Sequence, residues 1–237
     1  MKKRYIVLAC FAAMSVSLKS FAQTDNKAAA STQPAKKDKN DPSVRADQFV
    51  SVLNLTDTVK AGRVKAVIAA HMAAVRDWHN SHPGTLVPEG IDPINGKVFS
   101  ALQRQFIIDS TIPKTVHEAL MAGLRKDLTE DQVNAILDKY TIGKYQFTFN
   151  GYKSIVPDMT QADQDFITKE LAQAREESVD YKDVKNEMSN IFKIHKTRIE
   201  DYFYGSGRNW KTMYKTYVDK VLAAKKAGDK TAAPAEN

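Results

Sequence analysis

The longest stretch of this chain without proline or glycine runs from Asp158 to Tyr204. Since no residue that breaks a helix interrupts it, the stretch predicts helix. One continuous helix of that length would extend on the order of 65 Å at 1.5 Å per residue. A break near residues 178–180 suits a single domain better, with one long helix as the alternative, and Gly205 ends the stretch. This feature favours a mainly helical protein.

Start and stop signals predict more helices outside this stretch. The strongest start signal is Leu128-Thr129, where Thr129 can cap a helix and Gln132 can bond back to the cap. Pro83-Gly84 ends the first helix, which Thr56 can cap. Helices are predicted over five further segments: 56–82, 98–109, 113–126, 129–140 and 209–222.

The segment from Lys144 to Val156 has a different pattern. Apolar and polar residues alternate from Lys144 to Phe149, then Asn150-Gly151 precedes a second short apolar run. Alternation on both sides of Asn-Gly is typical of a two-residue hairpin. The sequence therefore predicts one helical-bundle-like domain of about six helices with one small β-hairpin at about 144–156.

Residues 1–22 have the layout of a secretory signal peptide. A basic start is followed by an apolar run from Tyr5 to Leu18 and by small residues that suit cleavage after Ala22. The run is short for a membrane span, which needs about 20 residues. A lipoprotein cleavage box at Cys10 is a weaker alternative, because the apolar run continues beyond it. We expect a periplasmic or extracellular protein with no transmembrane segment after cleavage.

Cleavage at Ala22 would change the chemistry of the chain. It removes Cys10, the only cysteine, and four basic residues without any acidic one, so the net charge falls from +7 to +3. Disulfides and thiolate ligands would be excluded, and so small a charge does not favour nucleic-acid binding. Composition then divides the chain into a flexible linker (23–46), a helical domain (47–222) and a disordered tail (223–237).

Three of the five histidines fall on the apolar faces of predicted helices. His71, His117 and His195 are each surrounded by apolar residues at helical spacing. If they converge, they form a metal site or a group that titrates near neutral pH. The simpler interpretation is three separate buried rings, each hydrogen-bonded locally. No cofactor is predicted.

Two tryptophans lie beside loops and are candidate ligand-binding residues. A flat ring next to hydrogen-bond donors suits a sugar or a uronate carboxylate. The alternative is that each tryptophan anchors a helix end in the core. The candidate binding residues are Trp78, His79, His82, Arg208, Asn209 and Trp210.

The remaining charged groups do not define a catalytic site. Arg104 with Asp109, and Arg175 with Glu176 and Asp180, are predicted to lie mostly on solvated helix faces. No Gly-x-Ser-x-Gly or His-Glu-x-x-His motif is present. The catalytic residues are unknown, and the sequence leans against an enzyme.

Several short motifs lie between Asp77 and Tyr217. They are Asp77-Trp78-His79-Asn80, Arg104–Ser110, Thr141–Lys144, Asn150–Pro157 and Gly207–Trp210. Together these motifs resemble the DUF3826 family of exported bacterial proteins. The resemblance implies a secreted, mainly helical protein without an assigned activity, associated with polysaccharide degradation. Leu128-Thr129-x-x-Gln132 is similar, more loosely, to the all-helical periplasmic LTxxQ proteins, whose fold has no hairpin.

Three functions fit the sequence. The first is a non-catalytic binding or accessory protein for an acidic glycan or an envelope polymer, linked to polysaccharide utilisation. The second is a periplasmic chaperone or stress protein. The third is a metal-binding protein or an enzyme that uses the inward-facing histidines.

Overall fold

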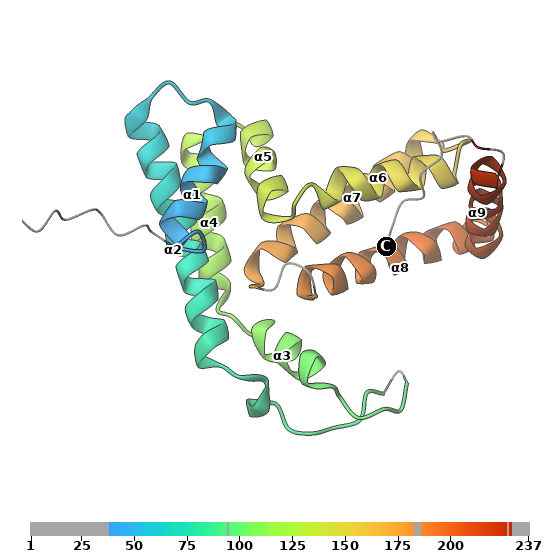
Figure 1. Ribbon diagram of the computed structural model, residues 1–237, viewed down its shortest axis with the longest axis horizontal. Coiled ribbons are helices and arrows are strands. Elements are labelled where there is room, and N and C mark those ends of the chain that lie inside the picture. Colours follow the sequence, from blue (N-terminus) through green and yellow to red (C-terminus); the bar gives the residue numbers. More distant parts are fainter. Residues whose placement is uncertain (1–37, 94, 183–185, 227, 229–237) are drawn as a thin grey trace, which may run out of the picture. The chain divides into compact units, whose positions relative to one another are not determined.

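The computed structural model describes residues 38–93, 95–182, 186–226 and 228 (Figure 1). The predicted signal peptide lies outside these residues. In the described part the mainly helical class is confirmed, with nine α-helices instead of about six. They are α1 (Pro42–Val50), α2 (Thr58–Ser81), α3 (Ala101–Asp109), α4 (Lys114–Asp127), α5 (Glu130–Tyr140), α6 (Lys144–Ile155), α7 (Gln161–Glu177), α8 (Glu187–Gly205) and α9 (Trp210–Lys226).

The predicted hairpin is wrong, because Lys144–Ile155 forms the helix α6. Tyr145, Phe149 and Tyr152 recur at intervals of four and three residues, which places them on one face of a helix. These three side chains contribute to a core cluster, whereas Phe147 on another face is 52% exposed. Among the described residues there is no strand, only an isolated antiparallel bridge between Ile91 and Val98.

The buried apolar side chains form two clusters. The first comes from α1, α2, α4 and α5, which lie together in Figure 1, and it also includes Val179. The second comes from α6, α7 and α8, together with Trp210 at the start of α9. The helices α7 and α8 pack along each other, and α9 contacts both α6 and α8.

The break in the long glycine-free stretch falls where the sequence predicts it. The helix α7 ends at Glu177, and the 3-10 turn η3 (Ser178–Asp180) separates it from α8. The hydroxyl of Ser178 donates to the Ala174 carbonyl at 2.6 Å, which closes the end of α7. Val179 enters the first core, so the turn is anchored there and Asp180 is fixed in position.

Caps define most of the other helix ends. Thr129 and Thr160 each form a capping box, with Gln132 and Asp163 respectively. Asp57, one residue after the expected Thr56, caps α2. The helix α1 begins within the segment predicted as linker, and α9 extends to Lys226 within the segment predicted as tail.

Candidate functional site

A cavity of about 660 Å³ opens beside His117, between α4, α5, α7 and the turn η3. Its wall combines carboxylates, cations, amides and apolar side chains. The polar residues on the wall include Lys114, His117, Glu118, Arg125, Glu130, Asn134, Gln173, Arg175, Glu176, Glu177 and Asp180. The apolar part includes Ile112, Pro113 and the ring of Tyr181.

A chain of hydrogen bonds leads from the core to this cavity. The Tyr140 hydroxyl lies 3.1 Å from Nδ1 of His71, whose Nε2 lies 3.0 Å from Oδ1 of Asp180. The other carboxylate oxygen of Asp180 lies 2.8 Å from Nδ1 of His117. Nε2 of His117 then lies 3.3 Å from Glu176. One carboxylate therefore joins two of the three inward histidines.

Three separate elements position this network. His71 belongs to the buried stripe of α2, with Val64 and Ile68. His117 lies one turn before Leu120 on α4, and its ring is about a quarter exposed to the cavity. Asp180 comes from η3, at the end of α7. The contacts join residues 63 and 109 positions apart, so no local pattern marks Asp180 as their partner.

The network changes the protonation of its members. The hydrogen bond to Asp180 raises the pKa of His117 to about 9, with Glu176 adding to the effect and burial opposing it. His117 is therefore an imidazolium at neutral pH. Burial tends to raise the pKa of Asp180, but hydrogen bonds from His117 and His71 outweigh it and keep this pKa below its usual range. Burial also raises the pKa of Tyr140, which stays a neutral phenol.

Two arginines flank the cavity in different ways. Arg175 is buried, bonds to Asp138 at 2.9 Å and to Asn134, and places its guanidinium over the Tyr145 ring. Arg125 is about half exposed, 3.2 Å from Glu130 and 3.9 Å from Glu176. Lys114 forms no ion pair with any residue in the described ranges. Arg125 and Lys114 are thus two cations that a ligand can reach.

His195, the third inward histidine, belongs to a separate pair of carboxylates. Its Nδ1 lies 2.8 Å from Glu170 and its Nε2 lies 3.0 Å from Glu177. The ring is 0% exposed, between α7 and α8. The structure therefore brings His71 and His117 together on Asp180 and leaves His195 with Glu170 and Glu177.

The candidate residues Arg208, Asn209 and Trp210 make structural contacts within the protein. Trp210 is 8% exposed and lies in the second core, with its ring centroid 5.7 Å from that of Phe203. Arg208 makes two hydrogen bonds to the buried Asp163, at 2.8 and 2.5 Å. Asn209 accepts a bond from the Thr212 amide at the start of α9. These positions match the core-anchor interpretation of Trp210.

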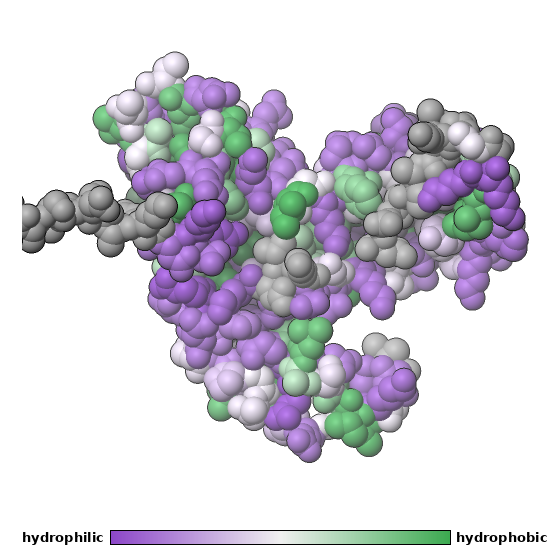
Figure 2. All heavy atoms as spheres, in the orientation of Figure 1, coloured by the Kyte–Doolittle hydropathy of each residue, from purple (hydrophilic) through white to green (hydrophobic). Residues whose placement is uncertain are grey.

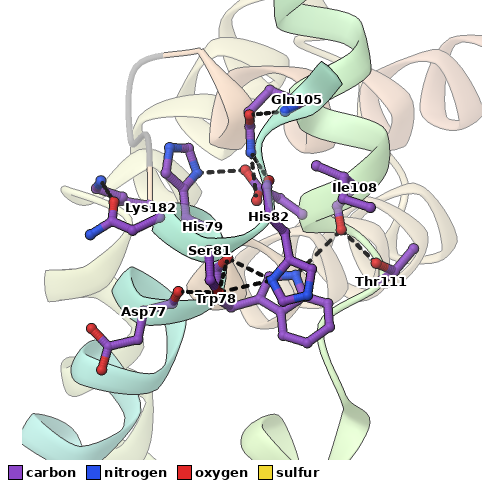
Figure 3. A network of polar contacts seen from close by, with 12 residues as sticks. Asp77, Trp78, His79, Ser81, His82, Gln105, Ile108, Thr111 and Lys182 are labelled. Carbon is purple, nitrogen blue, oxygen red and sulfur yellow. Dashed lines mark hydrogen bonds and ion pairs between the residues drawn. The ribbon is translucent and has the colours of Figure 1, made fainter. Parts of the chain in front are cut away.

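Trp78, His79 and His82 lie together at the end of α2 (Figure 3). The Trp78 and His82 rings stack with centroids 3.7 Å apart, and Nδ1 of His82 is bonded to the Trp78 carbonyl. The Trp78 indole donates to the Ile108 carbonyl at 3.4 Å. His79 points away from this stack, and its Nδ1 lies 2.7 Å from Asp109.

The acidic residues of two histidine networks lie deeper than the sequence predicts. Asp109 is 3% exposed and the side chain of Asp180 is 16% exposed, so the prediction that both lie on solvated helix faces is wrong. Each is paired with a histidine that lies far away in the sequence. Glu187 at the start of α8 is 1% exposed, and no sequence motif marks it.

Fold and site define an all-helical protein with a histidine–carboxylate cavity. The family model of DUF3826, described as a protein of unknown function, matches residues 39–223. The chain therefore belongs to the DUF3826 family, as its motifs indicate. No curated protein matches it. Within the described ranges, no helix is both long enough and apolar enough to cross a membrane.

Proposed function

We propose that this protein is an exported, non-catalytic saccharide-binding protein whose ligand occupies the His117 cavity. The observation that carries the proposal is the mixed wall of that cavity, which combines charged donors and acceptors with apolar side chains. The signal-peptide pattern in residues 1–22 supports the exported location. A role in polysaccharide utilisation follows from the same ligand chemistry.

The chemistry of the wall favours a ligand with many hydroxyls. Each sugar hydroxyl both donates and accepts hydrogen bonds, so it needs donors and acceptors close together. Glu118, Glu130 and Glu176 supply acceptors, while Arg125 and Asn134 supply donors. Pro113 and Tyr181 add the apolar surface on which the C–H face of a sugar ring packs.

Two cations of the wall, Lys114 and Arg125, can bind the carboxylate of an acidic sugar. Asp180 is neutralised by the imidazolium of His117, so its charge does not repel an incoming carboxylate. Arg125 and Lys114 offer accessible cations, and an arginine guanidinium binds a carboxylate through two parallel bonds. A uronate is therefore the ligand class that we expect to bind most tightly.

Binding is favoured over catalysis by the state of His117. Carboxylates hold both of its ring nitrogens, Asp180 at Nδ1 and Glu176 at Nε2. An imidazolium held in this way has no nitrogen available to accept a proton from a substrate. It can still hold Glu176 in position through Nε2.

Calorimetry against a panel of uronate-rich and neutral oligosaccharides tests the proposal. We expect a uronate oligomer to bind and Arg125→Ala to weaken it about 10-fold or more, the loss of one charge-assisted bond. Lys126→Ala is the matched control, since Lys126 is the exposed neighbour of Arg125 and does not line the cavity. If no saccharide binds, or if the two variants behave alike, the proposal fails.

The chaperone alternative has one observation in its favour. Apolar side chains are exposed on and next to the segment between α2 and α3: Leu86, Ile91, Val98 and Leu102. Figure 2 shows apolar patches over this segment on a surface that is otherwise largely hydrophilic. Such a patch suits an unfolded client. An assay in which the protein fails to suppress client aggregation at equimolar amounts would remove this alternative.

A further inference from the structure

The ends of three helices meet at a second polar cluster, whose three residues do not line the His117 cavity. His79 comes from the end of α2, Asp109 from the end of α3, and Glu187 from the start of α8. One ligand-type atom from each side chain lies within 4.8 Å of the others. In the described part of the chain, these are the residues whose spacing suits a metal ion.

Two carboxylates of this cluster are buried close to each other, which is unfavourable when both are charged. Asp109 and Glu187 are 3% and 1% exposed, so two carboxylates lie close together in the interior. Buried charges in proteins are paired with opposite charges or coordinate metals. Two carboxylates and one neutral imidazole form a ligand set that a divalent cation can bind.

The carboxylate of Asp109 is held in the orientation that a metal ligand needs. Nε2 of Gln105 donates to Oδ1 of Asp109 at 3.0 Å, which leaves Oδ2 directed at His79, 2.7 Å away. Gln105 is itself fixed, because its Oε1 accepts from the Gly84 amide at 2.6 Å. Figure 3 shows Gln105 and His79 in this arrangement. Residues that support ligands in this way are typical of metal sites.

Gly84 allows this support through its lack of a side chain. A Cβ at this position would lie 2.7 Å from the backbone nitrogen of Gln105, closer than a carbon can approach. The loop after α2 therefore reaches α3 only with glycine here. This close approach brings the Gly84 amide within reach of the Gln105 side chain.

The ligand set and its dimensions match a first-row transition ion. Zinc binds nitrogen and carboxylate oxygen at about 2.0–2.2 Å in tetrahedral geometry, which places ligand atoms about 3.4 Å apart. The separations in this cluster lie on both sides of that value, from 2.7 Å to at most 4.8 Å. The ring of His79 is 24% exposed, so an ion can enter from solvent and keep a water as its fourth ligand.

We propose that His79, Asp109 and Glu187 bind one divalent transition-metal ion of the Zn²⁺ type. The inward histidines differ from these residues, because carboxylates hold both nitrogens of His117 and of His195. A metal at the new site would tie the end of α2 to the end of α3 and the start of α8. The proposal does not depend on saccharide binding in the His117 cavity.

Zinc titration of the untagged exported chain, residues 23–237, tests this proposal after chelator treatment. Calorimetry should give one Zn²⁺ per chain, and His79→Ala should weaken binding at least about 100-fold, as should Glu187→Gln. His82→Ala is the matched control, since His82 lies three residues further on and stacks on Trp78 instead. It should leave the affinity within about 2-fold.

Two further measurements separate a lost ligand from a misfolded protein. Gln105→Ala keeps all three ligands and should weaken zinc binding about 10- to 100-fold, the usual effect of removing a supporting contact. Circular dichroism of each variant reports whether the helices are retained. If folded wild-type protein binds no zinc, or if zinc binding survives unchanged in folded His79→Ala, the proposal is overturned.

Discussion

Asp163 and Asp180 are both acids held inside the protein, but their partners differ in kind. Asp163 accepts bonds from Arg208, the Tyr202 hydroxyl and the Thr160 amide, and its side chain is 1% exposed. Asp180 is held by two histidines and is 16% exposed beside a cavity. The arginine guanidinium keeps its proton at neutral and mildly alkaline pH, whereas the imidazolium of His117, whose pKa is raised to about 9, loses its proton in mild alkali. The contacts of Asp163 with Arg208, Tyr202 and Thr160, called the structural joint below, therefore persist over this pH range. The contacts of Asp180 can respond to ligand and pH.

Replacing Asp163 removes the acceptor at the centre of the structural joint. Asp163→Ala leaves the Arg208 guanidinium and two other donors without their acceptor, so we expect the free energy of unfolding to fall by about 3–5 kcal/mol. Urea unfolding measures the loss. Asp165→Ala, on the same helix but outside the joint, should change stability by less than about 0.5 kcal/mol. Equal effects of the two variants would show that Asp163 is not a joint.

Trp210→Ala tests the same region without touching a charge. The ring is 8% exposed against Phe203 and Tyr152, so its removal should cost about 3–5 kcal/mol. Saccharide affinity of the folded protein should stay unchanged, because the ring is not part of the cavity wall. Tyr214→Ala, on the same helix and 40% exposed, is the control with a smaller expected loss. A Trp210→Ala protein that is stable but binds no glycan would contradict the account.

The Asp180 region predicts a loss of stability at alkaline pH. The pKa of His117 rises from its ordinary 6.5 to about 9 on folding. Its contribution is therefore complete below about pH 6.5 and disappears as the pH rises through about 9. Allowing for the partial exposure of the ring, the loss is roughly 2–3 kcal/mol.

Urea unfolding from pH 6 to pH 10 measures this alkaline loss. His117→Gln should flatten the profile, whereas His82→Gln should leave it unchanged. The contribution of Asp163 to the free energy of unfolding should depend on pH in the opposite direction. The Arg208 guanidinium holds the pKa of Asp163 well below its usual range, so that contribution is lost only in acid, below about pH 4. A His117→Gln profile as steep as that of the wild type would contradict the assigned imidazolium.

Two helix caps, at Thr129 and Thr160, should give the smallest changes in stability. Thr129→Ala removes a capping box and should cost about 1 kcal/mol. Thr160→Ala removes a similar cap but also loosens Asp163, so it should cost more than Thr129→Ala. Thermal unfolding of the two variants compares them directly. Equal losses would show that the Thr160 cap does not support the joint.

Helix ends are easier to predict from this sequence than the partners of polar side chains. The capping box at Thr129 and the break at 178–180 depend on residues that are neighbours in the chain, and the structure has both. The hairpin prediction failed because Tyr145 and Phe149, two of the alternating residues, also satisfy helical spacing together with Tyr152. Burial of the helical face that carries these residues favours a helix over a strand here.

The histidine networks show why sites are harder to predict. The inward positions of His71 and His195 follow from helical periodicity, and both rings are buried. Asp180 becomes a neighbour of His71 only through folding, across 109 positions, and Asp109 meets His79 across 30. No spacing within one helix encodes such a meeting. The sequence therefore allows His71 and His117 to converge, but only the packing of their helices decides that they do.

The most direct test of the saccharide-binding account is nuclear magnetic resonance of the five histidine rings during titration with uronate oligosaccharides. Binding in the cavity should shift the ring resonances of His117 in a saturable way and leave those of His82 in place. Lys114→Ala and Arg125→Ala together should abolish the shift. If His117 does not respond to any member of the panel while another histidine does, the ligand site lies elsewhere and the account is contradicted.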